Sequence, residues 1–266
     1  MCRLLAATSS TPRTLADIAG EAAIGGCLAL SAQHRDGWGL SWLEDGRVRV
    51  AKAPRRADDD PELDRLLHTV TSTGFLLHLR WATPGFGLSY ADTHPYTHGG
   101  RIALGHNGAL YAGTRLPELV PPQLAAHRQG TTDSEVFFLH VVAETEEHPL
   151  AEGLVRAVGR VIDFCTPSSL NSVVLTQDEI AVVVSYDPDQ APPHPGVDGV
   201  SRPDSEYYRI RCRISDEAVV FASSGFPQAG WADVANGTVA TVRLGTTEIR
   251  QTPVTRPLRV ADPAAG

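Results

Sequence analysis

Long apolar segments, clustered cysteines and basic runs are all missing from this sequence, and each absence excludes a class of protein. No stretch approaches the roughly 20 apolar residues of a membrane-spanning helix. The N-terminal segment carries a single basic residue, Arg3, and Asp17 and Glu21 interrupt the residues after it, which is unlike a secretory signal peptide. We therefore expect a cytoplasmic protein with no membrane partner.

The four cysteines, Cys2, Cys27, Cys165 and Cys212, lie far apart in the chain. None has the C-x-x-C spacing that is typical of zinc sites, and their density is far below that of a secreted disulfide scaffold. We expect no bound metal. Cys27, Cys165 and Cys212 stand among apolar or alternating residues, and we interpret them as small side chains of the core.

Positive charge is scarce as well. The net charge is −8, and the one adjacent basic pair, Arg55-Arg56, is followed at once by the three aspartates 58–60. This balance argues against a nucleic-acid partner. A hydrophobic content of 42% with 20% charged residues is otherwise typical of a globular protein, and 266 residues are enough to bury a sizeable core.

Short apolar runs and helical patterns alternate along the chain and predict an α+β protein. Predicted strands cover residues 2–8, 37–43, 47–50, 74–79, 101–106, 171–176, 179–186, 207–214, 218–223, 238–244 and 247–251. Predicted helices cover residues 12–24, 62–70, 133–148 and 151–165. The first helix is expected to begin near Pro12 and to end at Gly25-Gly26, and Thr132 to Glu135 fits a capping box before the third.

No internal repeat, heptad pattern or clean linker divides the chain, so we expect one domain over residues 2–266. Its motif-bearing part covers residues 2–186, and the C-terminal strands fall within 205–251. Between them, residues 187–204 are rich in Pro, Asp and Gly, and we predict an irregular loop there.

Cys2 follows the initiator methionine directly. Removal of Met1 would place a thiol and a free α-amine on the same residue, with ordinary pKa values near 8.5 and 8. In N-terminal nucleophile hydrolases an activated thiol or hydroxyl acts beside the terminal amine in this way. A cysteine at position two can also be incidental, so the interpretation depends on the other motifs.

Two motifs lie in the first third of the chain. Residues 34–39 read H-R-D-G-W-G, where glycines let the backbone approach a ligand closely; a plain turn with a core tryptophan is the alternative. We count Asp36 and Gly37 as substrate-binding candidates. Residues 80–83 read R-W-A-T at the end of a predicted strand. Arg80 there can bind a carboxylate with two hydrogen bonds, or it can form a surface salt bridge.

Two further motifs lie in the next part of the sequence. His106-Asn107-Gly108 comes after an apolar strand, and Asn-Gly in such a place is first of all a hairpin-turn signal. The alternative is an oxyanion hole in which the Asn107 amide and the Gly108 N–H stabilise a developing oxygen charge. Residues 130–135 read G-T-T-D-S-E at a helix start, where Asp133 stabilises the helix and can also accept a substrate ammonium.

Together and in this order, the N-terminal Cys, R-W-A-T, H-N-G and T-D-x-E segments resemble the class II glutamine amidotransferases. The resemblance covers roughly residues 2–186. It implies a four-layer αββα sandwich of the N-terminal nucleophile hydrolase type. It also implies Cys2 as the nucleophile, Asn107 and Gly108 as the oxyanion hole, Arg80 binding the α-carboxylate and Asp133 binding the α-ammonium. The motif neighbours Trp81 and His106 are further substrate-binding candidates.

The form of segment 34–39 resembles the stand-alone branch of this family that includes the ergothioneine-pathway γ-glutamyl hydrolase. Biosynthetic fusions of the family carry a D-S-x-G version there, and usually a His where this chain has Pro84. These departures leave the nucleophile and the carboxylate-binding arginine in place and concern the leaving-group side of the pocket.

Three classes of function remain open. The first is a hydrolase that cuts a γ-glutamyl amide through a thioester on Cys2, without metal or organic cofactor. Nothing after residue 186 resembles a synthase domain, which favours this class. The second is a glutaminase subunit that passes ammonia to a separate synthase. The third is a γ-glutamyl-binding protein without chemistry, for which a retained Met1 would argue. A homo-oligomer is open in each case.

The histidines also permit a metal-binding interpretation. His94, His98 and His106 fall within one short stretch of sequence. However, the first two flank a Pro-Tyr loop, and no carboxylate at ligand spacing accompanies them. We expect no metal at these residues.

Overall fold

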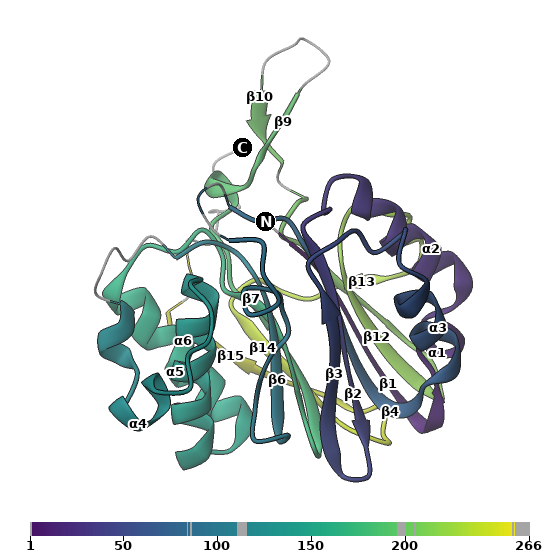
Figure 1. Cartoon of the computed structure of the whole chain (residues 1–266), viewed down its shortest axis with the longest axis horizontal. Helices are drawn as coiled ribbons and strands as arrows, with labels where there is room; N and C mark the ends of the chain where they lie inside the picture. The colour runs from purple at the N-terminus through teal and green to yellow at the C-terminus, as the bar shows by residue number, and fades with distance from the viewer. Residues whose placement is uncertain are drawn as a thin grey trace.

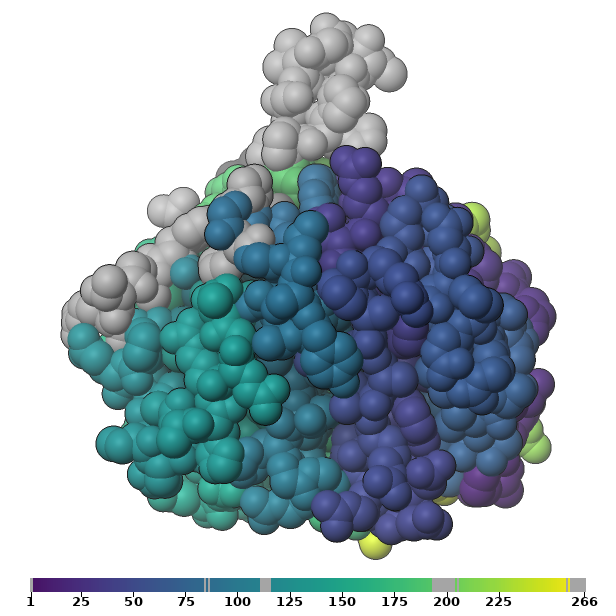
Figure 2. All heavy atoms as spheres, in the orientation of Figure 1, coloured from purple at the N-terminus to yellow at the C-terminus, as the bar shows by residue number. Residues whose placement is uncertain are grey.

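The protein is described here by a computed structural model that covers residues 2–83, 85, 87–110, 116–195, 201–204, 206–256 and 258. Two sheets pack face to face, and helices cover the outer face of each (Figure 1). On the face shown in Figure 2, the purple and blue residues of the first third lie on one side and the teal residues of the middle third on the other. The layers follow the αββα order predicted from the resemblance.

The first sheet is built from seven antiparallel strands of the described residues, in the order β13-β11-β12-β1-β4-β2-β3. Their bounds are β1 Arg3–Thr14, β2 Gly37–Glu44, β3 Arg47–Ala53, β4 Thr71–Arg80, β11 Ile210–Ile214, β12 Ala218–Ser223 and β13 Ala232–Asp233. The N-terminal strand thus lies in the middle of this sheet, which places its first residue between the neighbouring strand ends.

The second sheet runs β15-β14-β8-β7-β6-β5, again with antiparallel neighbours. Its strands are β5 Tyr96–His98, β6 Ile102–Asn107, β7 Asn171–Thr176, β8 Glu179–Val184, β14 Thr238–Arg243 and β15 Ile249–Pro253. The strands predicted for residues 171–176 and 179–186 are therefore present as β7 and β8, which pair as a hairpin. Strands from the C-terminal part of the chain complete both sheets, so the described residues after 186 belong to the same fold as the motifs.

Helices of the first half cover the first sheet, and helices of the middle of the chain cover the second (Figure 1). The first group is α1 Leu15–Ala19, α2 Glu21–Ala29, the 3-10 turn η1 Leu30–Ala32 and α3 Pro61–Thr69. The second group is η2 Leu116–Leu119, α4 Pro122–Ala125, α5 Asp133–Glu147 and α6 Leu150–Phe164. None of the described helices is long and apolar enough to cross a membrane.

Alternation along β1 explains why this strand reads as a continuous apolar run. Leu4 and Ala6 pack into the core between the two sheets. Leu5 and Ala7 point the other way, into the core beneath α1–α3. Because successive strand side chains face opposite sides, a strand covered on both faces must be apolar at every position.

The helix predicted for residues 12–24 is wrong at both ends. β1 continues to Thr14, and Pro12 lies in an exposed stretch where the pairing of β1 with β4 shifts register. A proline, which has no N–H, is tolerated at such an irregularity. Thr14 caps α1 instead, Gly20 at φ 83° separates α1 from α2, and Gly25-Gly26 lie inside α2 rather than ending it.

The segment predicted as an irregular loop, residues 187–204, contains regular structure. The 3-10 turn η3 Pro188–Gln190 begins it, and β9 Pro193–Pro195 pairs with β10 Ser201–Pro203. This strand pair projects from the end of the molecule (Figure 1). Residues 196–200 of the predicted loop lie outside the described residues.

The carboxylate of Asp60 ties the start of α3 to the core. Its oxygens accept hydrogen bonds from the Trp38 indole, at 2.7 Å, from the Arg55 guanidinium and from the Glu62 N–H. Burial raises the pKa of this carboxyl, but the hydrogen bonds outweigh burial and hold the pKa below its usual value. Asp60 therefore stabilises the fold above about pH 4 and loses that contribution as the pH falls further.

We expect Asp60→Asn to lower the urea midpoint of unfolding at pH 7, because the substitution removes a carboxylate charge that accepts hydrogen bonds from three donors. Between pH 5 and pH 3 the midpoint of the variant should decline less steeply than that of the wild type, since the lost group no longer titrates. Asp216→Asn, at an exposed turn, serves as the control and should track the wild type. An equally steep decline for Asp60→Asn and wild type would contradict this role.

Candidate active site

A small cavity lies where β1 begins and where β4 and β6 end. Its volume is ≈ 30 Å³, which is room for little more than a water molecule. The cavity is lined by Cys2, Arg80, Trp81, Ala82, Thr83, His94, His106, Gly108, Thr132, Asp133 and Ser134.

Cys2 and Asn107 meet across the two sheets. The backbone N–H of Cys2 donates a 2.7 Å hydrogen bond to Oδ1 of Asn107, and both residues are buried. The Cys2 thiol lies 3.9 Å from the carbonyl oxygen of Trp81. Because the Cys2 nitrogen is a donor, it fixes the Asn107 amide with Oδ1 toward the N-terminus and Nδ2 away from it.

The orientation of this amide leaves a donor available. Nδ2 of Asn107 is buried, and none of the described residues accepts a hydrogen bond from it. Gly108 follows at the cavity wall, where a Cβ would lie only 1.9 Å from the carbonyl oxygen of Ser169. Asn107 ends β6, and no hairpin turn forms at Asn107-Gly108. An oxyanion hole requires two adjoining donors beside the nucleophile; Asn107 bonds the Cys2 nitrogen, and Gly108 lines the same cavity as Cys2.

Arg80 ends β4 with a buried side chain. Its Nη2 donates to the carbonyl oxygen of Gly87 at 2.8 Å, while Nη1 finds no acceptor among the described residues. The sequence left open a surface salt bridge for Arg80, but Arg80 is buried and forms no salt bridge with any of the described residues. A buried guanidinium with a free N–H at a cavity can bind an anion such as a carboxylate.

Asp133 opens α5, and its carboxylate lines the cavity. Oδ2 accepts from the Leu110 N–H and Oδ1 from the Ser134 N–H, both at 2.8 Å. These bonds hold the carboxylate in place and leave lone pairs for a cation. The capping box is half formed: Thr132 accepts from the Glu135 N–H, but Glu135 bonds the amides of residues 129 and 130.

His106 lies behind the oxyanion candidates as a buried member of the wall. Nδ1 is 2.9 Å from the Ser134 hydroxyl, and Nε2 is 3.0 Å from the Ser169 carbonyl oxygen. Burial lowers the pKa of this imidazole despite the nearby Asp133 carboxylate. The ring is therefore neutral near pH 7, and it joins β6 to α5 and to the segment before β7.

Asp36 and Gly37 are not among the residues that line the cavity. The Asp36 carboxylate accepts a 2.8 Å hydrogen bond from the Ala82 N–H, and its own N–H donates to the Arg80 carbonyl oxygen. Gly37 pairs with Arg80 in the sheet. Segment 34–39 thus supports the backbone that carries the arginine, and substrate contact by these two residues stays a prediction.

Thr132, Ser134 and His94 line the cavity, although the sequence motifs assign them no role there. The first two lie in the segment 130–135, so a signal for them was present. The hydroxyl of Thr132 is 2.5 Å from that of Tyr96, which places β5 beside the start of α5. His94 carried no such signal, because it comes from a loop with no recognised pattern.

The C-terminal part of the chain supports the start of β1, next to Cys2. Arg3, next to Cys2, donates to the Tyr207 carbonyl oxygen at 2.8 Å and lies over the Tyr207 ring, 3.9 Å from its centroid. The Tyr207 hydroxyl is 3.3 Å from Nε2 of His34. Sequence motifs did not indicate this support, since it joins residues about 200 positions apart.

The next residue, Tyr208, supports the oxyanion side in the same way. Its hydroxyl donates to the Ser168 hydroxyl at 3.0 Å, and Ser168 in turn accepts from the Ala109 N–H. Asn171, which pairs with Asn107 between β7 and β6, donates to the Tyr208 carbonyl oxygen. Adjacent tyrosines therefore contact both sides of the candidate site.

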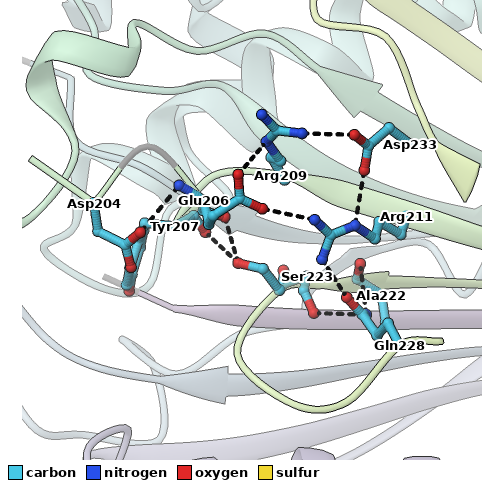
Figure 3. Close-up of polar contacts among 10 residues, drawn as sticks. Asp204, Glu206, Tyr207, Arg209, Arg211, Ala222, Ser223, Gln228 and Asp233 are labelled. Atoms are coloured by element: carbon cyan, nitrogen blue, oxygen red, sulfur yellow. Dashed lines mark hydrogen bonds and ion pairs between the residues drawn. The ribbon is translucent and has the colours of Figure 1, made fainter. Parts of the chain in front are cut away.

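A ring of four charges holds the segment that carries these tyrosines (Figure 3). Arg209 and Arg211 each bridge Glu206 and Asp233, with N···O distances between 2.6 and 2.9 Å. Gln228 accepts from Arg211 and donates to the carbonyl of Ser223 on β12. Each pair is partly exposed and weak alone, but the closed arrangement fixes the segment against the first sheet.

The three histidines for which a metal-binding interpretation was considered contact different partners. His94 stacks on His78, His98 meets His127, and His106 bonds Ser134. Within the described part of the chain, no group of three or more His, Cys, Asp or Glu side chains could hold a metal ion.

Two comparisons with known proteins point to the same family. A sequence profile of the class II glutamine amidotransferases matches residues 1–182. The chain is 25% identical over 235 residues to an uncharacterised protein of Methanocaldococcus jannaschii, covering 81% of this chain and 63% of that protein. It is 28% identical over 171 residues to the putative glutamine amidotransferase YafJ of Escherichia coli, covering 61% and 62%. It thus spans less than two thirds of either relative.

A solved structure shares the fold. A glutamine aminotransferase class-II domain protein from Silicibacter pomeroyi superposes with a TM-score of 0.66 at 20% identity, over 96% of this chain and 100% of that one. This likeness concerns the arrangement of the two sheets and their helices. Since the profile covers well over half of the sequence and includes every motif at the cavity, the chain belongs to the class II glutamine amidotransferases.

Proposed function

We propose that this protein hydrolyses a γ-glutamyl amide bond, in glutamine or in a γ-glutamyl-modified small molecule, through a thioester on Cys2. The observation that carries the proposal is the contact between Cys2 and Asn107. It joins the proposed nucleophile to the proposed oxyanion donor, and Gly108, the next residue after Asn107, lines the same cavity as Cys2. Membership of the family supports the same reaction class.

The reaction requires a free α-amine on Cys2, so Met1 must be removed. The amine, directly or through a water, takes the thiol proton, and the thiolate attacks the amide carbonyl carbon. Asn107 and Gly108 stabilise the resulting oxygen charge. The protonated amine then gives its proton to the leaving nitrogen as the C–N bond breaks. Water adds to the thioester and releases the γ-carboxylate of the glutamyl product.

The two charged groups of the cavity fit the amino-acid end of such a substrate. Arg80 has one N–H without an acceptor among the described residues, which can bind the α-carboxylate, and Asp133 offers an ordered carboxylate for the α-ammonium. Opposite charges in one small cavity recognise a zwitterion and reject a group with a single charge. These placements support a γ-glutamyl group as the acyl part of the substrate.

The H-R-D-G-W-G form of segment 34–39 favours the stand-alone branch that resembles the ergothioneine-pathway hydrolase over transfer of ammonia to a synthase. In that case the leaving group is the amine of a small organic molecule and not free ammonia. The structure supports a role for this segment in the site, because Asp36 holds the backbone of Ala82 beside Arg80. The curated relative described as a putative glutamine amidotransferase keeps ammonia transfer as the second candidate.

A panel of γ-glutamyl amides tests the proposal, with glutamate release as the readout. L-Glutamine, γ-glutamyl-p-nitroanilide and γ-glutamyl dipeptides are incubated with the wild type and with Cys2→Ala. We expect glutamate from at least one of them with the wild type and none with the variant. Glutamine turnover that rises only when a co-purifying protein is added would favour ammonia transfer. Equal release by both proteins, or none from any compound, would contradict the proposal.

A further inference from the structure

His94 lines the cavity beside Cys2, yet the proposed reaction gives it no task. Its side chain is 3% exposed, and none of the described residues hydrogen-bonds either ring nitrogen. A buried polar group without a partner is unfavourable. A group that enters the cavity can provide the missing hydrogen bond.

The imidazole of His94 is held rigidly. The ring stacks on His78 with 4.2 Å between centroids and meets the edge of Tyr96 at 4.5 Å. Its backbone touches β2 so closely that a Cβ at Gly39 would lie 2.1 Å from the His94 carbonyl oxygen. Lys52 donates to the carbonyl oxygens on both sides of the residue. The ring is thus fixed at the cavity wall rather than free to turn away.

The surroundings of His94 favour an anion. His78, on which it stacks, and Arg80 are two residues apart on β4 and therefore face the same side of the sheet. The guanidinium of Arg80 has one N–H without an acceptor in the described part of the chain. Burial, with the positive charges of neighbouring groups that include Arg80 and Lys52, keeps the pKa of His94 well below its usual value. The neutral ring still offers one N–H donor.

We infer that His94 donates a hydrogen bond to the α-carboxylate of the bound γ-glutamyl group, beside Arg80, and so selects substrates whose α-carboxylate is free. The inference rests on the proposed function for the identity of the ligand. It follows from two residues that line one cavity, Arg80 and His94, each with a buried nitrogen that has no partner among the described residues. Asp133, on α5, is left to bind the ammonium of the same molecule.

Calorimetric binding of two product-like ligands tests this role without turnover. The ligands are L-glutamate and its α-carboxamide, which differ only at the group that His94 contacts. The quantity compared is the ratio of their dissociation constants, which does not depend on the fraction of protein that is folded. The proteins are the wild type, His94→Leu, His94→Gln and His140→Leu, the last altering a buried histidine of α5 that does not line the cavity.

The wild type should bind L-glutamate more tightly than the α-carboxamide, and His94→Leu should reduce that preference about tenfold or more. His94→Gln, which restores an N–H donor, should recover part of it, and His140→Leu should keep the wild-type ratio. An unchanged ratio in His94→Leu, or equal weakening of both ligands, would overturn the inference. So would a wild type that binds neither ligand.

The same proteins distinguish failure of the inference from failure of the proposed function. Turnover of each γ-glutamyl amide of the panel, L-glutamine included, is measured beside the binding. With turnover present, His94→Leu should raise KM and leave kcat nearly unchanged, because the contact exists in both the ground state and the transition state. Selective binding of glutamate without any turnover would contradict hydrolysis while supporting the contact. Turnover with an unchanged KM in His94→Leu would contradict the contact alone.

Discussion

Replacing Cys2 by alanine should lower glutamate release by about 10⁴- to 10⁶-fold, which is the size of loss seen when a catalytic nucleophile is removed. In the proposed reaction the thiol forms the thioester. The other described residues at the cavity wall offer hydroxyls, imidazoles, a guanidinium and a carboxylate without the adjacent amine, so none of them replaces it. Steady-state release of glutamate from the best γ-glutamyl amide measures the effect.

The matched control is Cys27→Ala. Cys27 is buried in the core beneath α1–α3, and burial raises the pKa of its thiol to about 12. This variant should lose stability through a small cavity but keep the turnover of its folded fraction. Cys2→Ala should bind L-glutamate as well as the wild type does. Residual turnover within tenfold of the wild type in Cys2→Ala would remove the thiol from the mechanism.

Asn107→Ala should lower kcat by about 10²–10³-fold with little change in KM. In the proposed reaction the amide of Asn107 stabilises a charge that develops only as the thiolate adds to the carbonyl, so its loss should affect the transition state more than substrate binding. The variant also removes the 2.7 Å contact with the Cys2 nitrogen, which adds to the loss of rate. Single-turnover kinetics with a saturating γ-glutamyl amide measures the chemical step directly.

Asn236→Ala is the control for this prediction. The side-chain amide of Asn236, like that of Asn107, accepts a hydrogen bond from a backbone N–H, that of Tyr186, and it also donates to the Tyr186 carbonyl oxygen. It should therefore lose stability by a similar mechanism, but without an effect on kcat. If Asn107→Ala raised KM and left kcat unchanged, Asn107 would be a substrate-binding residue rather than an oxyanion donor.

The candidate site could be found from the sequence because its residues carry local signals. Cys2, Arg80, Gly108 and Asp133 each lie in a short motif at the end or start of an element, and all four line the same cavity. An antiparallel sheet with its N-terminal strand in the middle brings such ends together. Local motifs and the order of elements were sufficient for these residues.

Other parts of the site depend on packing that no local pattern records. His94 lies at the cavity because the loop before β5 packs against Gly39. Tyr207 supports Arg3 because strands from the two ends of the chain are neighbours in one sheet. Such contacts join residues far apart in sequence and become visible only when the fold is known.

The errors in secondary structure have the same origin. Pro12 predicts a helix start, because proline is common in a first turn, but tertiary pairing with β4 extends the strand past it. Gly25-Gly26 predicts a helix end, yet α2 continues because one side of it is packed against the first sheet. In both places the sheet outweighs local preference.

Intact-protein mass spectrometry after exposure to a diazo-ketone analogue of glutamine tests the central claim most directly. The competing thiols are poor nucleophiles near pH 7, since burial raises the pKa of Cys27 to about 12 and that of Cys165 to about 11, and also raises that of Cys212. We predict one adduct, on a peptide whose N-terminus is Cys2, and none in Cys2→Ala. Labelling at another residue, no labelling, or a mature protein that retains Met1 would contradict Cys2 as the N-terminal nucleophile.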